Sequence, residues 1–171
     1  MGRKSTKENK NVFFQAREAL SLTREKASEL LEWISPDRIE RIEYDTDAPR
    51  PDEVLEMADK YNAPELCNHY CSKYCEIGKQ YVPEVRIKDL SQIVMEMLAS
   101  LNSMHKKKDR LIEITADGSI DGDEIEDFVY IQEELERISI TVDALRIWSE
   151  QMLSRGVIDI DAYNAYKNRK H

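Results

Sequence analysis

Three cysteines and a histidine occur close together between Cys67 and Cys75, and these residue types can bind a metal ion or undergo redox chemistry. On a continuous helix, Cys67 and Cys75 lie about 12 Å apart along the axis, whereas thiolates that share one zinc ion need their sulfurs within roughly 4 Å. His69 lies about 200° around the helix from Cys67. We therefore expect Cys67, Cys71 and Cys75 to be packing residues, with no metal or cofactor; ligation by Cys71 and Cys75, or a redox-sensing thiol, is the alternative.

An acidic stretch between Glu113 and Glu124 partly matches the pattern of a calcium-binding EF-hand loop. Asp117, Gly118 and Glu124 stand at the fifth, sixth and twelfth places of that pattern. The first and third places hold Glu113 and Thr115, where aspartate or asparagine is usual. We expect a glycine-containing turn here, with calcium binding as the alternative. The sequence offers no nucleophile with a nearby base, so we expect no enzymatic activity.

Five short helices are predicted in the first 75 residues, and they must position any functional side chain in this half of the chain. Thr23 is the expected N-cap of one helix. Ser35 is the expected N-cap of the next, with Pro36 at the first helical position, where its missing N–H costs nothing. A proline-containing loop at 47–52 leads into a fourth helix, and Pro64 opens a fifth.

The helix-turn-helix of Cro and repressor-type (XRE family) regulators is similar to two runs of this sequence, LTREKASELL at 22–31 and SPDRIERIE at 35–43. The run PDEVLEMADKY at 51–61 resembles the fourth helix of the same family. The resemblance implies a lambda-repressor-like domain in which the helix after Ser35 enters the major groove of DNA.

That resemblance implies sequence-specific binding of double-stranded DNA by a transcriptional regulator. Arg24 would then contact a phosphate or a base, and Arg38 and Arg41 can each read a guanine through two hydrogen bonds, worth about 1 to 3 kcal/mol of discrimination. Two half-sites are ordinarily engaged together, which predicts a homodimer. The candidate DNA-binding residues are Arg24, Ser35, Pro36, Asp37, Arg38 and Arg41.

Acidic residues in the same helix favour a different function. Asp37 and Glu40 put negative charge where phosphates would approach, and the turn at 32–34 is longer than usual and lacks the customary glycine of the family. The net charge of −9 also argues against a general phosphate-binding surface. The alternative is a protein-interaction module with a degenerate helix-turn-helix domain that binds no DNA, in which Arg38 and Arg41 pair with neighbouring acids.

The second half of the chain predicts a hairpin of two long helices joined by a polar reversal at 117–123. Heptad spacing defines a first apolar seam of Ile87, Leu90, Val94, Met97, Leu101, Met104 and Leu111, broken only at Lys108. It defines a second seam of Phe128, Ile131, Leu135, Ile138, Val142, Leu145, Trp148 and Met152. We expect the two helices to fold back on one another with a thin core, whose apolar stripe would be better covered by a partner, either the same hairpin in a second chain or the front domain. We expect a short helix near 160–167 to pack Tyr163 and Tyr166 against the hairpin.

Composition indicates a helix-rich soluble protein. The chain has 171 residues, 41% of them hydrophobic, with only 5 Gly and 5 Pro. Its apolar runs are far shorter than the roughly 20 residues that a membrane span needs, and the first ten residues lack the apolar stretch of a secretory signal. We therefore expect an all-α cytoplasmic protein with a basic flexible arm at 1–10, a helix-turn-helix domain at 11–75, a linker at 76–85 and a dimerising or regulatory hairpin at 86–171.

Overall fold

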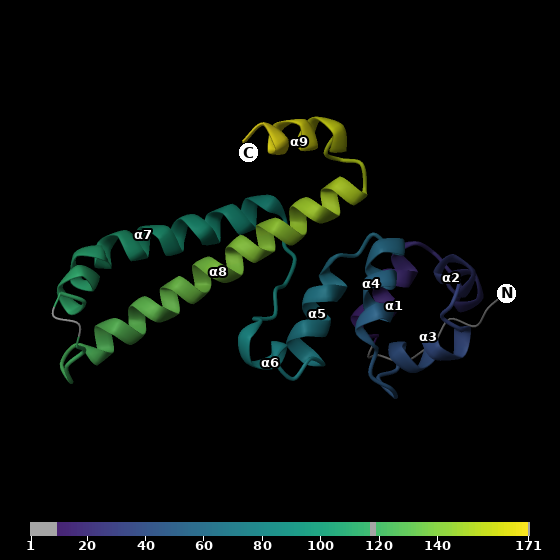
Figure 1. Cartoon of the computed structure of the whole chain (residues 1–171), viewed down its shortest axis with the longest axis horizontal. Helices are drawn as coiled ribbons and strands as arrows, with labels where there is room; N and C mark the ends of the chain where they lie inside the picture. Colours follow the sequence, from purple (N-terminus) through teal and green to yellow (C-terminus); the bar gives the residue numbers. More distant parts are fainter. Residues whose placement is uncertain (1–9, 117–118, 171) are drawn as a thin grey trace. The chain divides into compact units, whose positions relative to one another are not determined.

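The computed structural model describes residues 10–116 and 119–170, and all regular secondary structure in that part of the chain is helical (Figure 1). The predicted order of five short helices followed by a long hairpin is confirmed. The α-helices are α1 (Val12–Ala19), α2 (Arg24–Leu31), α3 (Pro36–Glu43), α4 (Pro51–Lys60), α5 (Glu65–Lys73), α6 (Gly78–Tyr81), α7 (Leu90–Ile114), α8 (Ile125–Ser154) and α9 (Ile160–Lys167). The basic arm at 1–10 lies almost wholly outside the described residues.

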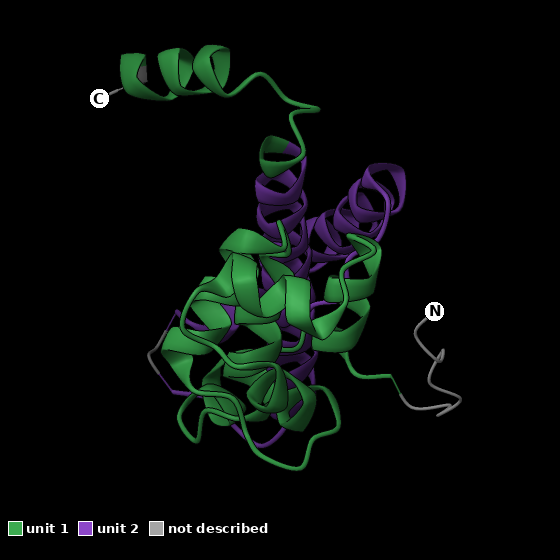
Figure 2. Cartoon of the chain, turned by 90° about the vertical axis from the view of Figure 1, so that its right-hand side faces the viewer, with its two compact units in different colours: residues 1–84, 153–171 green, residues 85–152 purple. Residues whose placement is uncertain are grey.

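The described residues form two compact units, which Figure 2 colours separately. The first unit contains the residues up to Glu84 together with those from Leu153 onward, and the second contains Val85–Met152. The first unit therefore holds the five short helices, and the second holds the helical hairpin. Within the described residues, no helix is both long and apolar enough to cross a membrane.

Side-chain caps start helices α2 and α3. The hydroxyl of Thr23 accepts a hydrogen bond from the N–H of Lys26 at the start of α2. The hydroxyl of Ser35 accepts one from the N–H of Arg38, with Pro36 at the first position of α3. These caps satisfy N–H groups that have no partner inside their own helix, and they confirm the predicted starts of α2 and α3.

A single hydrophobic core joins helices α1 to α5. Ile39 and Ile42 of α3 are buried against Leu31 of α2, as the amphipathic spacing predicts. The other buried members of this core are Phe13, Ala27, Ile34, Val54, Met57, Ala58, Tyr61, Ala63 and Leu66. Because five helices share one core, the backbone around α2 and α3 is fixed by tertiary packing as well as by its caps.

The hairpin pairs α7 with α8, as predicted, but on different residues. The hydroxyls of Ser103 and Tyr130 lie 2.6 Å apart across the pair, and Lys107 donates to Asp127. Four positions of the first seam in α7 are exposed and are not covered by α8, namely Leu90, Val94, Leu101 and Lys108. Leu135 and Val142 of the second seam are exposed as well. The fully buried hairpin positions are Ile93, Ser100, Ile114, Ile131, Glu134, Thr141, Ala144, Ile147 and Gln151.

Two short helices differ from the sequence prediction. The segment at 76–85, expected to be a linker with little helical pattern, contains α6. A side chain at Gly78 would place its Cβ 2.1 Å from the carbonyl oxygen of Cys71, so only glycine allows this approach of α6 to α5. Helix α9 forms where expected, and its described residues are exposed.

Candidate nucleic-acid interface

A tight turn joins α2 to α3. Glu32 ends α2 with φ 59° and ψ −48°, and the N–H of Trp33 donates to the carbonyl oxygen of Leu31 at 2.6 Å. These three residues form a γ-turn of the strained form, in which the central residue has a positive φ. Glycine adopts such a φ more easily than glutamate does. A glutamate therefore occupies a strained position in the turn between α2 and α3.

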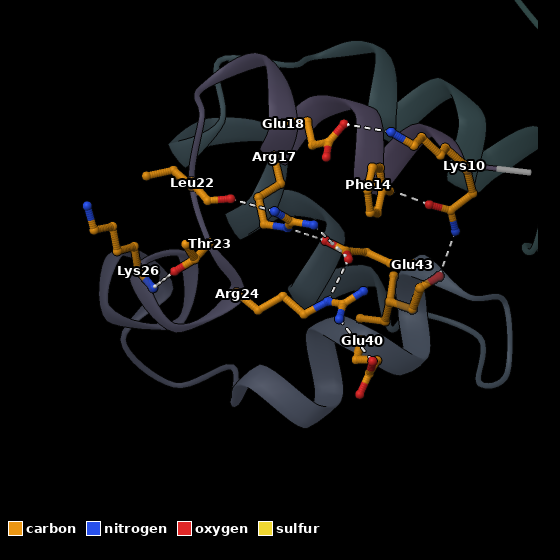
Figure 3. A network of polar contacts seen from close by, with 12 residues as sticks. Lys10, Phe14, Arg17, Glu18, Leu22, Thr23, Arg24, Lys26, Glu40 and Glu43 are labelled. Carbon is orange, nitrogen blue, oxygen red and sulfur yellow. Dashed lines mark hydrogen bonds and ion pairs between the residues drawn. The ribbon is translucent and has the colours of Figure 1, made fainter. Parts of the chain in front are cut away.

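Arg24 lies at the first position of α2 and binds two glutamates of α3 (Figure 3). Its Nε donates to Glu43 at 2.8 Å, and its Nη1 donates to Glu40 at 2.9 Å. Burial lowers the pKa of Arg24, but hydrogen bonds to Tyr44 and Glu43 outweigh burial and raise it overall. The guanidinium is therefore charged and already bonded within the chain.

Arg38 lies in the first turn of α3 and is held more tightly. Its Nε and Nη2 donate to the two carboxylate oxygens of Glu53 at 2.7 and 2.6 Å, a bidentate pair. Its Nη1 donates to Asp47 at 2.6 Å, and Nη2 also donates to the carbonyl oxygen of Ala48 at 2.8 Å. The hydrogen bond to Glu53 raises the pKa of Arg38.

Glu53 is buried at the start of α4, with 2% of its surface exposed. Its carboxylate also accepts a hydrogen bond from the backbone N–H of Arg50 at 2.7 Å. Burial alone would raise the pKa of Glu53, but the bonds from Arg38 and Arg50 lower it below its usual value. Glu53 is therefore a buried carboxylate whose charge depends on Arg38.

The remaining candidate residues lie on the exposed part of α3. Ser35, Asp37 and Arg41 are exposed, and Pro36 is half-buried. Within the described residues, no carboxylate lies within ion-pair distance of Arg41. The two arginines proposed to read guanine are thus in different states, because Arg38 is bonded to buried acid and Arg41 faces solvent.

A buried ion pair behind α3 was not found by sequence reasoning. Arg17 of α1, 6% exposed, donates from Nε and Nη2 to Glu43 at 2.5 and 3.0 Å (Figure 3). Its Nη1 donates to the carbonyl oxygen of Leu22, which begins the chain leading into α2. Glu43 therefore binds Arg17 and Arg24 together and connects helices α1, α2 and α3.

An open hollow of about 530 Å³ lies at the start of α3. The guanidinium of Arg50 lies 5.7 Å from the ring centre of Trp33 at its rim. The charged and aromatic side chains that line it are those of Trp33, Arg38, Asp47, Arg50 and Glu53. Arg38 is the less exposed of the two arginines that line the hollow, and it is already bonded to two of the carboxylates there.

The cysteine segment is packed into α5 and the turn after it. Cys67, Cys71 and Cys75 are half-buried, and Cys75 Sγ accepts a hydrogen bond from the N–H of Gly78 at 3.4 Å. In the described part of the chain, no group of three or more His, Cys, Asp or Glu side chains is placed to hold a metal ion. The proposed calcium loop includes Asp117 and Gly118, which lie outside the described residues.

Comparisons with known proteins give this chain no family. It matches no protein-family model, no curated protein and no solved structure. The resemblance to Cro and repressor-type regulators therefore stays a prediction that depends on the two sequence runs and the turn between them.

Proposed function

We propose that this chain is a homodimeric protein-interaction module whose helix-turn-helix domain binds a basic protein partner and does not read DNA. The observation that carries the proposal is the bonding of Arg24 and Arg38 to carboxylates of their own chain. Both were candidates for DNA contact, and each would have to leave its glutamates to make one.

The energies favour the intramolecular bonds. Removing one partner of a buried ion pair costs about 3 to 5 kcal/mol, because the other charge stays buried without compensation. A bidentate arginine contact to guanine is worth about 1 to 3 kcal/mol. Moving Arg38 from Glu53 to a base would therefore cost more than it returns, since the Glu53 carboxylate is almost fully buried.

The charges that remain exposed on α2 and α3 are mainly negative. Arg41 and Lys26 are the exposed basic residues of these helices and the turn between them. The exposed acidic residues of the same segment are Glu25, Glu29, Glu32, Asp37 and Glu40. An acidic surface attracts a partner with Lys and Arg side chains and repels a phosphate backbone.

The direct test is the binding of random-sequence duplex DNA at low ionic strength, followed by fluorescence anisotropy. We expect no binding at micromolar protein. Affinity that falls steeply with added salt and decreases in Arg41→Ala would contradict the proposal, because counterion release marks contact with phosphates.

The positive test uses Lys- and Arg-rich peptides on an array. We expect the double variant Asp37→Asn, Glu40→Gln to lose signal relative to the unmodified chain. The matched control is the double variant Asp52→Asn, Asp59→Asn, which removes two exposed acids from α4 rather than from α3. Equal loss in the control and in the α3 variant would show attraction by overall charge only.

A DNA-binding transcriptional regulator of the XRE type is the second candidate function, and Arg41 supports it. This side chain is exposed on α3 beside Ser35 and Asp37, where a groove-binding helix would contact bases. Selection of bound fragments from random DNA would favour this candidate if it returned one sequence that Arg41→Ala no longer selects.

A further inference from the structure

Helix α7 carries two heptad seams that share three residues. The seam that α8 covers consists of buried or half-buried residues, which are Ile93, Met97, Ser100, Met104, Lys107, Leu111 and Ile114. The second seam shares Met97, Met104 and Leu111, but its own members Leu90, Val94 and Leu101 are 39%, 39% and 45% exposed. A helix with two adjacent seams is typical of a bundle in which it contacts two neighbours.

Helix α8 has the same double pattern. The residues it turns toward α7 are buried or half-buried, and they include Asp127, Ile131, Glu134, Ile138, Thr141, Leu145 and Trp148. A second seam shares Ile131, Ile138 and Leu145, and its own members Leu135 and Val142 are 49% and 51% exposed. Both helices of the hairpin therefore have an apolar seam that the other helix does not cover.

The two uncovered seams lie on the same flank of the hairpin. Ser103 and Tyr130 hydrogen-bond on one flank, where Lys107 also lies 5.4 Å from the ring centre of Tyr130. Around α7, Leu101 is about 160° from Ser103, and around α8, Leu135 is about 140° from Tyr130. Because Ser103 and Tyr130 share one flank, Leu101 and Leu135 share the opposite one.

The contact between α7 and α8 contains buried polar side chains, whereas the open flank exposes apolar ones. Ser100, Glu134 and Thr141 are buried in the hairpin, and Glu134 pairs with Arg137. Leucines and valines on the open flank remain about half exposed. A hairpin that functions alone is expected to bury its leucines and valines and to expose its polar side chains, since leucine and valine are normally buried.

We infer that this open flank is the interface with a second copy of the chain, and that two hairpins form a four-helix bundle across a two-fold axis. We name it the outer face, and it consists of Leu90, Val94, Leu98, Leu101, Leu135 and Val142. The inference depends on the homodimer in the proposed function and supplies its contact surface. A two-fold contact needs a surface that matches itself, and one flat apolar flank does so.

Charge allows the same surface to meet a copy of itself. The chain has a net charge of −9, so two copies repel each other at a distance. The uncovered seams contain no charged residue from Leu90 to Met104 or from Phe128 to Leu145. Like charges are therefore not placed opposite each other where the two copies meet.

The size of the outer face agrees with a dimer contact. Six large apolar side chains that are 39% to 51% exposed make a patch on the order of several hundred Å², the size that marks an interaction site on a soluble protein. A standard interface buries about 800 Å² per partner, with an apolar centre and a polar rim. The outer face supplies the centre, and the flanking polar residues of α7 and α8 supply the rim.

The test compares two exposed valines of α8 by sedimentation equilibrium of the full chain at micromolar concentration. Val142 on the outer face and Val129 are 51% and 44% exposed. They lie about 140° apart around the helix, so Val129 faces away from the proposed contact. We expect the unmodified chain and Val129→Glu to be dimers, and Val142→Glu to shift the dissociation constant by at least about 100-fold toward monomer.

The outcomes separate this inference from the proposed homodimer. If the chain is a dimer and Val142→Glu and Leu98→Glu leave it unchanged, the copies meet elsewhere and the outer-face inference is wrong while the homodimer stands. If the unmodified chain is a monomer, both are wrong. Because these valines and Leu98 are exposed, circular dichroism of each variant should match the unmodified chain, which shows that a shift to monomer is not unfolding.

Discussion

The two units of this chain differ in the side chains that they bury. In the first unit, charged groups such as Arg17 and Glu43 are buried as ion pairs behind a core of apolar side chains from five helices. In the hairpin, Ser100 and Thr141 are buried together with isoleucines, while the leucines and valines of the outer face are 39% to 51% exposed. The proposed self-association therefore uses the apolar outer face of the hairpin, whereas the proposed contact with a basic partner uses the acidic surface of α2 and α3.

The largest expected loss of stability is in the first unit. Glu43→Ala removes the carboxylate that Arg17 and Arg24 share, and leaves the Arg17 guanidinium buried without its partner. We expect the free energy of unfolding to fall by about 3 to 5 kcal/mol, measured by urea denaturation. Glu40→Ala removes an acid that is about half exposed and should cost no more than about 1 kcal/mol. Similar small losses in the two variants would mean that the buried pair does not stabilise the unit.

The next effect tests which seam holds the hairpin together. Ile93 is 1% exposed, so Ile93→Ala should lower the free energy of unfolding by about 2 to 4 kcal/mol. Leu101 is 45% exposed, and in a chain kept below its dimerisation concentration Leu101→Ala should cost less than about 1 kcal/mol. A larger loss for Leu101 than for Ile93 in the monomer would instead support the seam that the sequence predicts.

The difference between the predicted seam and the one that α8 covers shows which features of the hairpin can be predicted from the sequence. Heptad spacing predicts two long helices and their antiparallel return, and both are present. It favours the seam with Leu90, Val94 and Leu101 because those residues are the more apolar ones. The two seams share Met97, Met104 and Leu111 and differ by one residue at the positions between them, so periodicity cannot say which one faces α8. That choice depends on contacts between residues far apart in the chain, such as Ser103 with Tyr130.

In the candidate site too, contacts between residues close in the sequence can be predicted, whereas contacts between distant residues cannot. The caps at Thr23 and Ser35 are predictable because each acts on an N–H three residues away. The partners of Arg24 and Arg38 are 19 and 15 residues distant, and they become neighbours only after α2, α3 and α4 pack. The sequence therefore marked Arg24 and Arg38 only as candidates for DNA contact, and it offered pairing with acids as an alternative for Arg38 and Arg41.

A smaller change, which is a gain in stability, is expected at the turn before α3. The described non-glycine residues with positive φ are Ser21, Glu32, Asp45 and Asn62, all in the first unit, which shows that its packing tolerates local strain. Glu32→Gly should stabilise the chain by about 1 kcal/mol, because glycine adopts φ near 59° without a Cβ clash. Glu29→Gly, in the interior of α2, should destabilise it by about 1 kcal/mol. Equal destabilisation by the two changes would show that Glu32 is not strained.

The smallest expected effect is the pH dependence of stability, and it arises from His69 in the first unit. Burial lowers the pKa of His69 below its usual 6.5, although Glu84 and Asp45 oppose this shift. As pH falls below about 6.5, the unfolded chain takes up a proton before the folded chain does, so the first unit loses stability on acidification. His69→Phe keeps a ring against Phe13 and Tyr74 and removes the titration, so its melting temperature should change less between about pH 7 and pH 5. Glu53 contributes a loss with the same sign at lower pH, because its pKa is lowered in the folded state and its stabilisation disappears as the carboxylate is protonated. A melting temperature that rises on acidification would contradict the buried, neutral state of His69.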